Sequence, residues 1–465
     1  MTTQREDERA DDGSAGTDAL AQQSYAQAER ELLARWPETR LEPSLDRIRA
    51  LMDLLGQPQR AYPSIHITGT NGKTSTARMI DALLRALNLR TGRITSPHLE
   101  EVRERICLDG EPIARDRFAE LYRDVLPFAD LVEQSQPHPL SFFEMTIGMS
   151  YAAFADAPVD AAVVEVGLGG EWDATNVIDA QVAVVTPISL DHTHLLGGTV
   201  ELIAREKSGI IKPGAVAVLG RQSVEAAEVL LDRIAEVGAT AAREGIEFGV
   251  VDRQLAVGGQ LVTVKGLSRE YADIDLPLHG AYQAHNAACA IAAVEAFLGA
   301  GQGGGELEPG LVREALGGVT SPGRLEVVRR GPTVLLDAAH NPAGAQATAE
   351  ALAEEFTFEH LVGVVGAMRD KDVRGVLEAF EPVLDEVVVT ANASLRAMPV
   401  DELAAIAEEV FGPERVSAQT RLDDAIDRAI ALAEAGVEDP SRGGTGVLIT
   451  GSVVTVGEAG RLLRH

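Results

Sequence analysis

Apolar and polar positions follow two different periods along this 465-residue chain. Apolar residues recur at helical spacing over 25–35, 45–55 and 76–87, and a short, continuously apolar run covers 65–68. A spacing of three to four residues indicates an amphipathic helix, whereas a short apolar run bounded by a glycine turn indicates a buried strand. The pattern therefore predicts a strand, a glycine-rich turn and a helix in direct succession over 65–87.

The same two periods alternate further along the chain. Short apolar runs predict strands at 161–166, 182–186 and 215–219, and helical spacing predicts helices at 143–154 and 200–210. Strands that alternate with helices are typical of α/β domains with a parallel sheet. We therefore predict an α/β fold.

The second half of the chain changes pattern twice. Residues 246–278 show short alternating runs that predict an antiparallel β insertion, and an alanine-rich helix is expected over 286–298. A glycine-rich loop follows at 299–305, but we place the domain boundary at Ser321-Pro322-Gly323 because strands and helices alternate again beyond it. The strands expected there are 333–336, 361–365, 386–390 and 446–450. The predicted organisation is a disordered acidic tail (1–22), a first domain (23–320) and a smaller α/β domain (321–465).

Composition narrows the class of protein. Hydrophobic residues make up 45% and charged residues 24%, as in soluble globular proteins. The amino terminus has no apolar signal region, no stretch of about 18 apolar residues occurs, and Cys107 and Cys289 are the two cysteines. We therefore expect a cytoplasmic protein without a membrane partner. A formal net charge of −30 disfavours nucleic-acid binding, and it means that an anionic substrate needs a local positive pocket.

Lysine is scarce in this chain, which has 36 arginines and five lysines. The lysines are Lys73, Lys207, Lys212, Lys265 and Lys371. Unlike arginine, lysine offers a compact charge and an amine that can lose its proton. Selected lysines are therefore candidates for chemistry, with a random composition bias as the alternative.

The turn after the first predicted strand has the properties of a phosphate-binding loop. It comprises Gly69, Thr70, Asn71, Gly72, Lys73, Thr74 and Ser75. The loop is shorter than the strict eight-residue pattern, which would place a glycine at Ile67. Backbone N–H groups, the helix N-terminus and the Lys73 ammonium still suit an anion. The alternative is a glycine-rich turn without a ligand.

Several further motifs occur in order along the chain. They are 95–99 (Thr-Ser-Pro-His-Leu), 103–106 (Arg-Glu-Arg-Ile), 165–170 (Glu-Val-Gly-Leu-Gly-Gly), 173–176 (Asp-Ala-Thr-Asn), 190–193 (Leu-Asp-His-Thr), 206–212 (Glu-Lys-Ser-Gly-Ile-Ile-Lys), 321–324 (Ser-Pro-Gly-Arg) and 337–342 (Asp-Ala-Ala-His-Asn-Pro). Together with the loop, this set resembles the Mur ligase superfamily and, within it, the folylpolyglutamate and dihydrofolate synthases. The resemblance implies a P-loop ATPase domain with a parallel sheet, followed by a smaller Rossmann-like glutamate-ligase domain. We expect a monomer.

The resemblance also implies that Ser96, Glu165 and His192 hold two Mg²⁺ ions with the nucleotide. Glu165 ends a predicted strand, so its carboxylate is expected at the sheet edge where ligands bind. Oxygen ligands suit magnesium. The alternatives are a surface carboxylate for Glu165 and a structural loop histidine for His192.

Lys207 corresponds to a lysine that is carbamylated in the family and contacts magnesium. Arginine cannot undergo this reaction, since it never offers a neutral nitrogen to carbon dioxide. A surface salt bridge between Glu206 and Lys207 is the alternative.

In the second domain the resemblance implies that Arg324 and Asp337, with Asn286 of the first domain, contact ATP. Asp337, His340 and Ser452 are expected near the incoming amino acid, and a purely structural role is the alternative for His340. The residues expected to act in catalysis are Lys73, Lys207, Asp337 and His340.

For the acceptor, Ser141-Phe142-Phe143 resembles the segment that binds dihydropteroate in bifunctional relatives, although Phe143 could equally belong to the core. One run departs from the family, which has Arg-Leu before Asp173 where this chain has Glu171-Trp172. Trp172 is therefore expected at the acceptor pocket and leaves the acceptor preference open.

These observations predict an enzyme that uses ATP to join L-glutamate to dihydropteroate or folates through an acyl phosphate. A cell-wall Mur ligase is less favoured, because only about 60 residues precede the loop and such enzymes carry an additional amino-terminal domain. A nucleotide-binding switch without ligase chemistry stays open. A dinucleotide-binding oxidoreductase is excluded by the missing Gly-x-Gly-x-x-Gly fingerprint.

Overall fold

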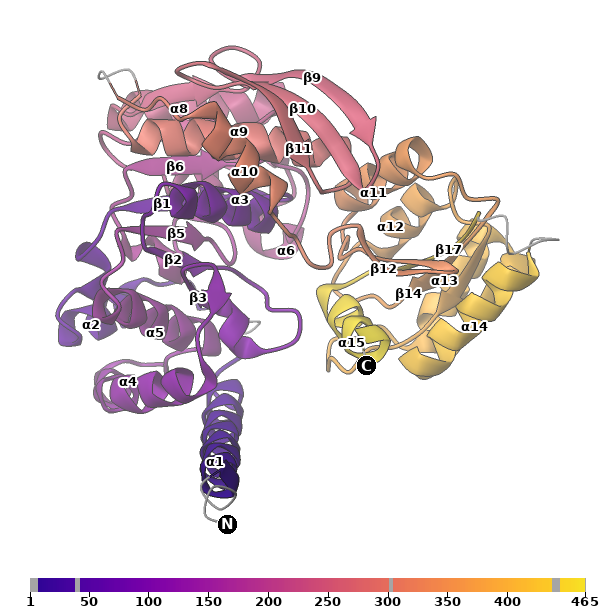
Figure 1. The fold of residues 1–465 in the computed structure, drawn as a ribbon, viewed down its shortest axis with the longest axis horizontal. Coiled ribbons are helices and arrows are strands. Elements are labelled where there is room, and N and C mark those ends of the chain that lie inside the picture. The colour runs from indigo at the N-terminus through magenta and orange to yellow at the C-terminus, as the bar shows by residue number, and fades with distance from the viewer. Residues whose placement is uncertain (1–6, 38–41, 301–303, 437–443, 465) are drawn as a thin grey trace.

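Two α/β units lie side by side in the computed structural model, which describes residues 7–37, 42–300, 304–436 and 444–464. Each unit is built around a mainly parallel sheet covered by helices (Figure 1). The predicted α/β fold class is therefore confirmed. No helix in the described part of the chain is long and apolar enough to cross a membrane.

The first sheet has eight strands in the order β4-β3-β2-β5-β1-β6-β7-β8. Its strands are β1 (Ser64–Thr68), β2 (Thr91–Ile94), β3 (Ile106–Leu108), β4 (Glu111–Pro112), β5 (Ala161–Glu165), β6 (Val182–Val185), β7 (Val216–Leu219) and β8 (Thr240–Arg243). The helices of this unit are α1 (Asp7–Leu33), α2 (Asp46–Leu54), α3 (Lys73–Ala86), α4 (Arg115–Ser135), α5 (Phe142–Asp156), α6 (Thr193–Leu196), α7 (Val200–Ser208) and α8 (Val224–Val237).

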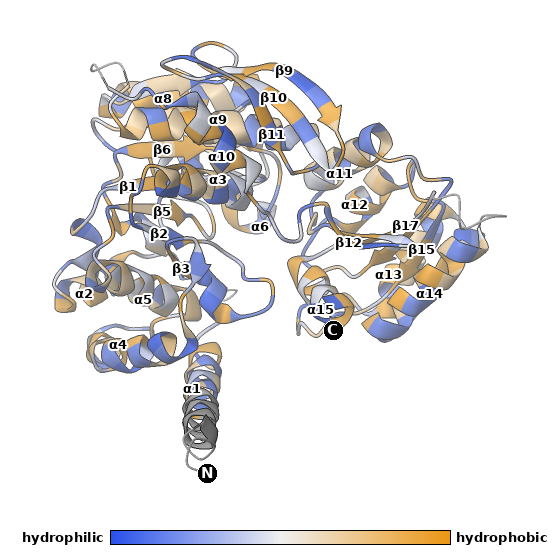
Figure 2. Ribbon diagram, viewed as in Figure 1, coloured by the Kyte–Doolittle hydropathy of each residue, from blue (hydrophilic) through white to orange (hydrophobic). Residues whose placement is uncertain are grey.

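Strand β1 lies at the centre of this sheet, between β5 and β6 and parallel to both. Its residues are buried throughout, and the central strands are mostly hydrophobic in Figure 2. Parallel strands end at the same sheet edge, so the residues that follow β1, β5 and β6 come together there. This edge carries the candidate site.

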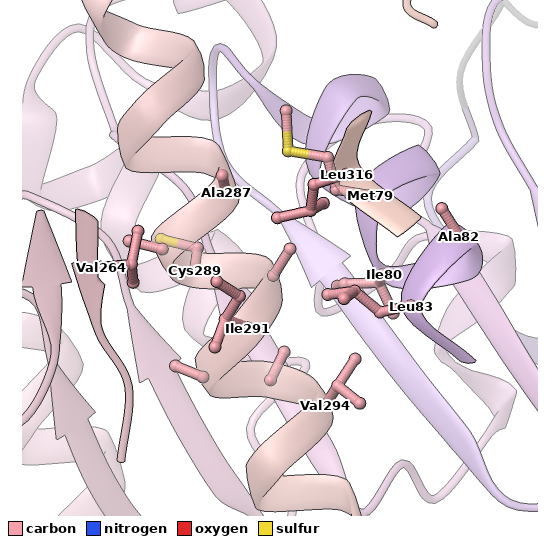
Figure 3. Packing of buried hydrophobic residues seen from close by; sticks show 14 of the residues in the cluster. Met79, Ile80, Ala82, Leu83, Val264, Ala287, Cys289, Ile291, Val294 and Leu316 are labelled. Atoms are coloured by element: carbon pink, nitrogen blue, oxygen red, sulfur yellow. The ribbon is translucent and has the colours of Figure 1, made fainter. Parts of the chain in front are cut away.

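The β insertion forms a separate three-stranded antiparallel sheet, as predicted, with β9 (Gly249–Ala256), β10 (Gly259–Lys265) and β11 (Glu270–Leu276). Helix α9 (Ala281–Phe297) follows, and then α10 (Pro309–Gly317). Figure 3 shows α9 residues such as Ile291 and Val294 packed against Ile80 and Leu83 of α3. The many alanines of α9 let it lie close to its neighbours, because small side chains permit close helix packing.

The second unit has a six-stranded sheet in the order β12-β13-β17-β14-β15-β16. Its strands are β12 (Glu326–Arg330), β13 (Thr333–Leu336), β14 (His360–Val365), β15 (Glu386–Val389), β16 (Val416–Ala418) and β17 (Thr445–Thr450). The covering helices are α11 (Pro342–Glu355), α12 (Val373–Phe380), α13 (Val400–Phe411), α14 (Leu422–Ala435) and α15 (Val453–Arg464).

Every strand that the apolar runs predicted is present within one residue of its expected ends. The amino terminus differs from expectation, since α1 begins at Asp7 whereas we predicted disorder over 1–22. Residues 1–6 lie outside the described residues. Alanine, glutamate, arginine and glutamine favour helices even in a polar segment. The amino-terminal part of α1 extends beyond α4 in Figure 1, whereas Tyr25, Ala28 and Leu32 pack in the core of the first unit.

A buried carboxylate joins the insertion to the second unit. Glu355, at the end of α11, is 4% exposed and accepts hydrogen bonds from Arg253 Nη2 (2.6 Å) and the Gly280 N–H (2.7 Å). His279 Nδ1 lies 2.8 Å from its other oxygen. The neighbouring Glu354 also binds Arg253 but is 48% exposed.

Replacing Glu355 with alanine is expected to lower the free energy of unfolding by about 2–4 kcal/mol, because the Gly280 N–H and His279 lose their buried acceptor and Arg253 Nη2 loses its carboxylate partner. Denaturant titration measures this change. The matched control is Glu354→Ala, which removes a more exposed partner of the same arginine and is expected to cost less than about 1 kcal/mol. Equal losses for the two variants would contradict the assignment.

Candidate active site

The phosphate loop connects β1 to α3 and requires glycine at two positions. Gly69 has φ +142°, and a Cβ there would lie 1.9 Å from Thr186 Oγ1. Gly72 has φ +88°, and a Cβ there would lie 2.5 Å from Asn286 Oδ1. Both positions therefore combine a backbone conformation that favours glycine with a close neighbour.

Lys73 begins α3 and folds back over the loop. Its Nζ donates to the carbonyl oxygens of Gly69 and Thr70, both at 3.0 Å. Burial lowers the pKa of this ammonium, although the nearby Glu165 carboxylate opposes the change. The lysine thus places a positive charge beside the loop, where it can meet a phosphate.

Glu165 ends β5 next to this loop and is 1% exposed, which excludes the reading of a surface carboxylate. It accepts a hydrogen bond from Thr74 Oγ1 at 2.8 Å and from the Ser96 N–H at 3.3 Å. Burial raises the pKa of this carboxyl, while the ammonium of Lys73 acts in the opposite direction.

The donors around Glu165 fit a magnesium ion. Within the described residues, no group of three or more His, Cys, Asp or Glu side chains is arranged as a metal site. Magnesium, however, is usually held by one or two carboxylates together with phosphate oxygens and water. A buried carboxylate beside the hydroxyl of Thr74 and next to a phosphate loop matches that requirement.

His192 contacts a lysine of the second unit. Lys371 Nζ lies 3.1 Å from His192 Nε2 and 2.6 Å from Asp191 Oδ1. Burial alone would raise the pKa of the Asp191 carboxyl, but hydrogen bonding from His340 and the Lys371 charge hold it well below its usual range. His192 therefore belongs to a polar cluster that spans both units.

Lys207 lies beneath the phosphate loop rather than on a helix surface. It is 4% exposed and its Nζ donates to the Gly69 carbonyl at 2.9 Å, which excludes the alternative of a surface salt bridge with Glu206. Burial, with a further contribution from Lys73, lowers the pKa of Lys207 to about 7. A neutral amine is therefore available near neutral pH.

The second unit contributes residues from the carboxyl ends of its own strands. Asp337 follows β13, and its oxygens accept from the Leu325 and Ala339 N–H groups at 2.8 and 3.0 Å. Burial raises the pKa of this carboxyl, and Arg324 opposes the rise. Asn341 and Asn71 exchange side-chain hydrogen bonds of 3.1 and 3.2 Å across the boundary between the units.

Two cavities meet at this boundary. The smaller, about 360 Å³, is lined by all seven residues of the phosphate loop and by Ser96, Glu165, His192, Lys207, Asn286, Arg324, Asp337 and His340. We call it the phosphate cavity. The larger, about 660 Å³, we call the acceptor cavity. The two share a wall formed by Ser96, Pro97, Gly167, Leu168, His192, His340 and Val453.

The acceptor cavity contains four of the five residues predicted to bind substrate. Ser141, Phe143, Trp172 and Ser452 line it, and the tip of the Phe143 ring packs so closely on Gly167 that a Cβ there would be 2.4 Å from Cζ. Phe142 does not line it.

Phe142, which was predicted to contact the acceptor, lies outside this cavity. Its ring is 5% exposed and packs in the core, with the Arg105 guanidinium 4.7 Å from the ring centroid. Successive residues of a helix point about 100° apart, so Phe142 faces the core while Phe143 faces the cavity.

Three residues of the site were missed by sequence reasoning. Lys371, Asp191 and Asn341 form the cluster across the two units. Asp191 and Asn341 lie within the motifs 190–193 and 337–342. For Lys371, the only available signal of a functional role was the scarcity of lysine in the chain. Their proximity depends on how the units pack, which no local pattern reveals.

A buried histidine lies on β1 below the loop. His66 is fully buried, its Nε2 is 2.9 Å from Thr175 Oγ1, and Thr175 also donates to Asp173 at the acceptor cavity. Burial, and to a smaller degree the Lys212 charge, lowers the pKa of His66 from 6.5 to about 3. The neutral ring therefore persists well below neutral pH.

Stability is expected to fall in acid partly because of His66. Between pH 6.5 and 3 the unfolded chain binds a proton here that the folded chain does not, so this histidine reduces stability by up to about 1.4 kcal/mol per pH unit as pH falls. His66→Gln, which can keep the contact with Thr175, should show a shallower loss between pH 6 and 4 in urea titrations. Identical slopes would rule out this origin.

Comparison with known proteins defines the class first. Residues 128–294 match the Mur ligase middle domain, and residues 323–453 match the Mur ligase glutamate ligase domain. Together with the phosphate loop and the two-unit fold, these matches define a ligase of the Mur type.

Similar proteins identify the family within this class. The chain is 55% identical to the dihydrofolate synthase/folylpolyglutamate synthase of Mycobacterium tuberculosis (strain ATCC 25618 / H37Rv), over 94% of this chain and 93% of that protein. It is 34% identical to the folylpolyglutamate synthase of Lacticaseibacillus casei, over 88% and 91% of the two chains. The chain belongs to the dihydrofolate synthase/folylpolyglutamate synthase family.

Solved structures agree with this assignment. The Mycobacterium tuberculosis folylpolyglutamate synthase complexed with ADP has a TM-score of 0.91 and 54% identity, covering 96% of this chain and 99% of that one. Escherichia coli FolC in complex with DHPP and ADP has a TM-score of 0.81 and 27% identity, covering 95% and 97%.

Proposed function

We propose that this protein uses ATP to join L-glutamate to a pterin or folate carboxylate, forming ADP and phosphate. The observation that carries the proposal is the shared wall between the phosphate cavity and the acceptor cavity. A carboxylate in one cavity can reach a phosphate in the other at this wall. The names of the relatives, which include both synthase activities, support the same substrates.

In the first step the acceptor carboxylate attacks the γ-phosphate of ATP, giving an acyl phosphate and ADP. Lys73, from the phosphate loop, and Arg324, from the second unit, balance the phosphate charge. Two magnesium ions held by Ser96, Glu165 and His192 would supply further charge neutralisation. Asn286 lies beside Gly72 and lines the phosphate cavity, where it would contact the nucleotide.

Lys207 takes part as a carbamate. Its amine is buried and has a lowered pKa, which favours the neutral form that reacts with carbon dioxide. The product is a carbamate beside the loop. Its negative charge takes the place of the lysine's positive charge, and its oxygens suit magnesium.

In the second step the α-amine of L-glutamate attacks the acyl carbon, and phosphate leaves the tetrahedral intermediate. His340 lies on the shared wall and Ser452 in the acceptor cavity, so both are placed near the point of attack. Asp337 fixes the loop that carries His340, since its carboxylate accepts from the Ala339 N–H at 3.0 Å. The second unit therefore delivers glutamate to an intermediate held by the first.

Parallel assays of ADP release with dihydropteroate and with tetrahydrofolate, each with and without L-glutamate, test the proposal. We expect glutamate-dependent release with both acceptors, and mass spectrometry should show a product larger by one glutamyl residue. ADP release that ignores glutamate would favour a nucleotide switch. No turnover with either acceptor would overturn the proposed substrates.

A further inference from the structure

Both tryptophans of this chain line the acceptor cavity. The chain has two tryptophans and only 4% aromatic residues, so their coincidence at one cavity is notable. Trp172 precedes the Asp-Ala-Thr-Asn motif, whereas Trp36 lies beyond the end of α1 and outside every recognised motif. The amino-terminal segment therefore forms part of a cavity that the sequence assigned to residues 141–172.

The main chain of Trp36 is fixed to the start of α5. The Phe142 N–H donates to the Trp36 carbonyl at 2.8 Å, and Trp36 pairs with Ser141 in a parallel β-bridge. Ser141 in turn caps α5 through the Glu144 N–H, with its hydroxyl accepting at 3.1 Å. The position of Trp36 is thus set by the same turn that carries the predicted acceptor segment.

A buried ion pair between Arg47 and Glu144 holds Glu42 against the first turn of α5. Arg47 Nε donates to Glu144 Oε1 at 2.9 Å, and Arg47 Nη2 donates to the Glu42 carbonyl at 2.8 Å. The other Glu144 oxygen accepts from the Ser141 N–H at 2.8 Å. Glu42 and Arg47 also line the cavity, so the amino-terminal wall is anchored on both sides of α5's first turn.

The indole of Trp36 is also oriented by a neighbouring ring. It is half-buried and makes an edge-to-face contact with His138, with 5.2 Å between centroids and an interplanar angle of 70°. Edge-to-face contacts fix the relative planes of two aromatic rings. The indole therefore meets the cavity in a defined orientation.

The two cavities also give the direction of the acceptor. Trp36, His138, Phe143 and Trp172 line the acceptor cavity but not the phosphate cavity. The reacting carboxylate has to lie at the shared wall. A flat apolar end of the acceptor then extends toward these aromatic side chains rather than toward Arg369, Asp370 and Arg396 on the side of the second unit. A flat heteroaromatic ring is the group that such an end accommodates best.

We propose that Trp36 is an acceptor-binding residue whose indole stacks on the flat ring system of the acceptor. This inference rests on the proposed function, which gives a pterin or folate as the acceptor. It makes Trp36 a determinant of acceptor specificity, whereas Trp36 does not line the phosphate cavity.

Steady-state kinetics provide the first test. Trp36→Ala is expected to raise the KM for dihydropteroate or tetrahydrofolate by roughly fivefold to twentyfold, as loss of an aromatic contact predicts, and to leave the KM for ATP within about twofold. Trp36→Phe should restore most of the affinity, because it keeps a flat ring. The matched control is Leu33→Ala, at the end of α1, which is 54% exposed and outside the cavity and should change neither KM.

Fluorescence provides a second test that does not depend on turnover. Trp172→Phe leaves Trp36 as the single tryptophan, and its emission should be quenched on titration with tetrahydrofolate, after correction with free N-acetyltryptophanamide. Quenching without any ligase turnover would support acceptor binding at Trp36 but contradict the proposed reaction. Turnover with an unchanged acceptor KM in Trp36→Ala and no quenching in Trp172→Phe would overturn the role of Trp36.

Discussion

Replacing Lys207 by arginine is expected to reduce glutamate-dependent ADP release by about a hundredfold or more, while nucleotide binding persists. The Lys207 amine is buried beneath the phosphate loop and its pKa is lowered to about 7. A neutral amine can form a carbamate, but a guanidinium stays protonated and cannot. If the lysine instead acted only as a buried cation bound to the Gly69 carbonyl, arginine would preserve much of that role.

The matched control is Lys212→Arg, in the same motif but only half-buried, which is expected to keep most of the activity. Calorimetric titration with a non-hydrolysable ATP analogue checks that the nucleotide still binds to Lys207→Arg. Partial recovery of Lys207→Ala by a short carboxylic acid would support a carboxylate at this position. Full activity of Lys207→Arg would refute the carbamate.

Replacing Gly69 by alanine is expected to lower the free energy of unfolding by about 2–5 kcal/mol and to abolish ATP binding. The new Cβ would lie 1.9 Å from Thr186 Oγ1 and 2.8 Å from the Thr186 carbonyl oxygen. The hydroxyl could rotate away, but the carbonyl belongs to the main chain beyond β6 and cannot. The loop would have to shift, and with it the Gly69 carbonyl that Lys73 and Lys207 both bind.

The control for backbone strain alone is Gly214→Ala. Gly214 also has a positive φ, +76°, but a Cβ there would meet nothing within 4 Å. We expect a cost of about 1 kcal/mol and unchanged ATP binding. Thermal unfolding with and without ATP compares the two variants, and similar losses in both would show that the contact with Thr186 is unimportant.

Local sequence patterns predicted the buried parallel strands well, because burial on both faces requires several consecutive apolar residues. Strand β1 is apolar and enclosed on both faces, so its run ends where the phosphate loop begins. Strands β3 and β4, at one end of the sheet, gave no such run, since they have only three and two residues. The loop itself was predictable because its glycines and Lys73 are contiguous.

For several side chains the sequence predicted a place at the site, but only the tertiary structure showed whether they are buried or exposed. Glu165 and Lys207 were expected at the site, and their burial, at 1% and 4% exposed, is what separates them from surface groups. Phe142 and Phe143 are adjacent in sequence, yet the helix turns one to the core and the other to the cavity.

The sequence by itself determined the α/β class, the phosphate loop and the family motifs, because each of these is written in neighbouring residues. Only the tertiary structure decided which distant groups meet: Lys371 with Asp191, Glu355 with Arg253, and Trp36 with the turn at Ser141. The physical reason is that these contacts join segments about 100 or more residues apart. Their geometry depends on how complete surfaces pack, and no local period encodes it.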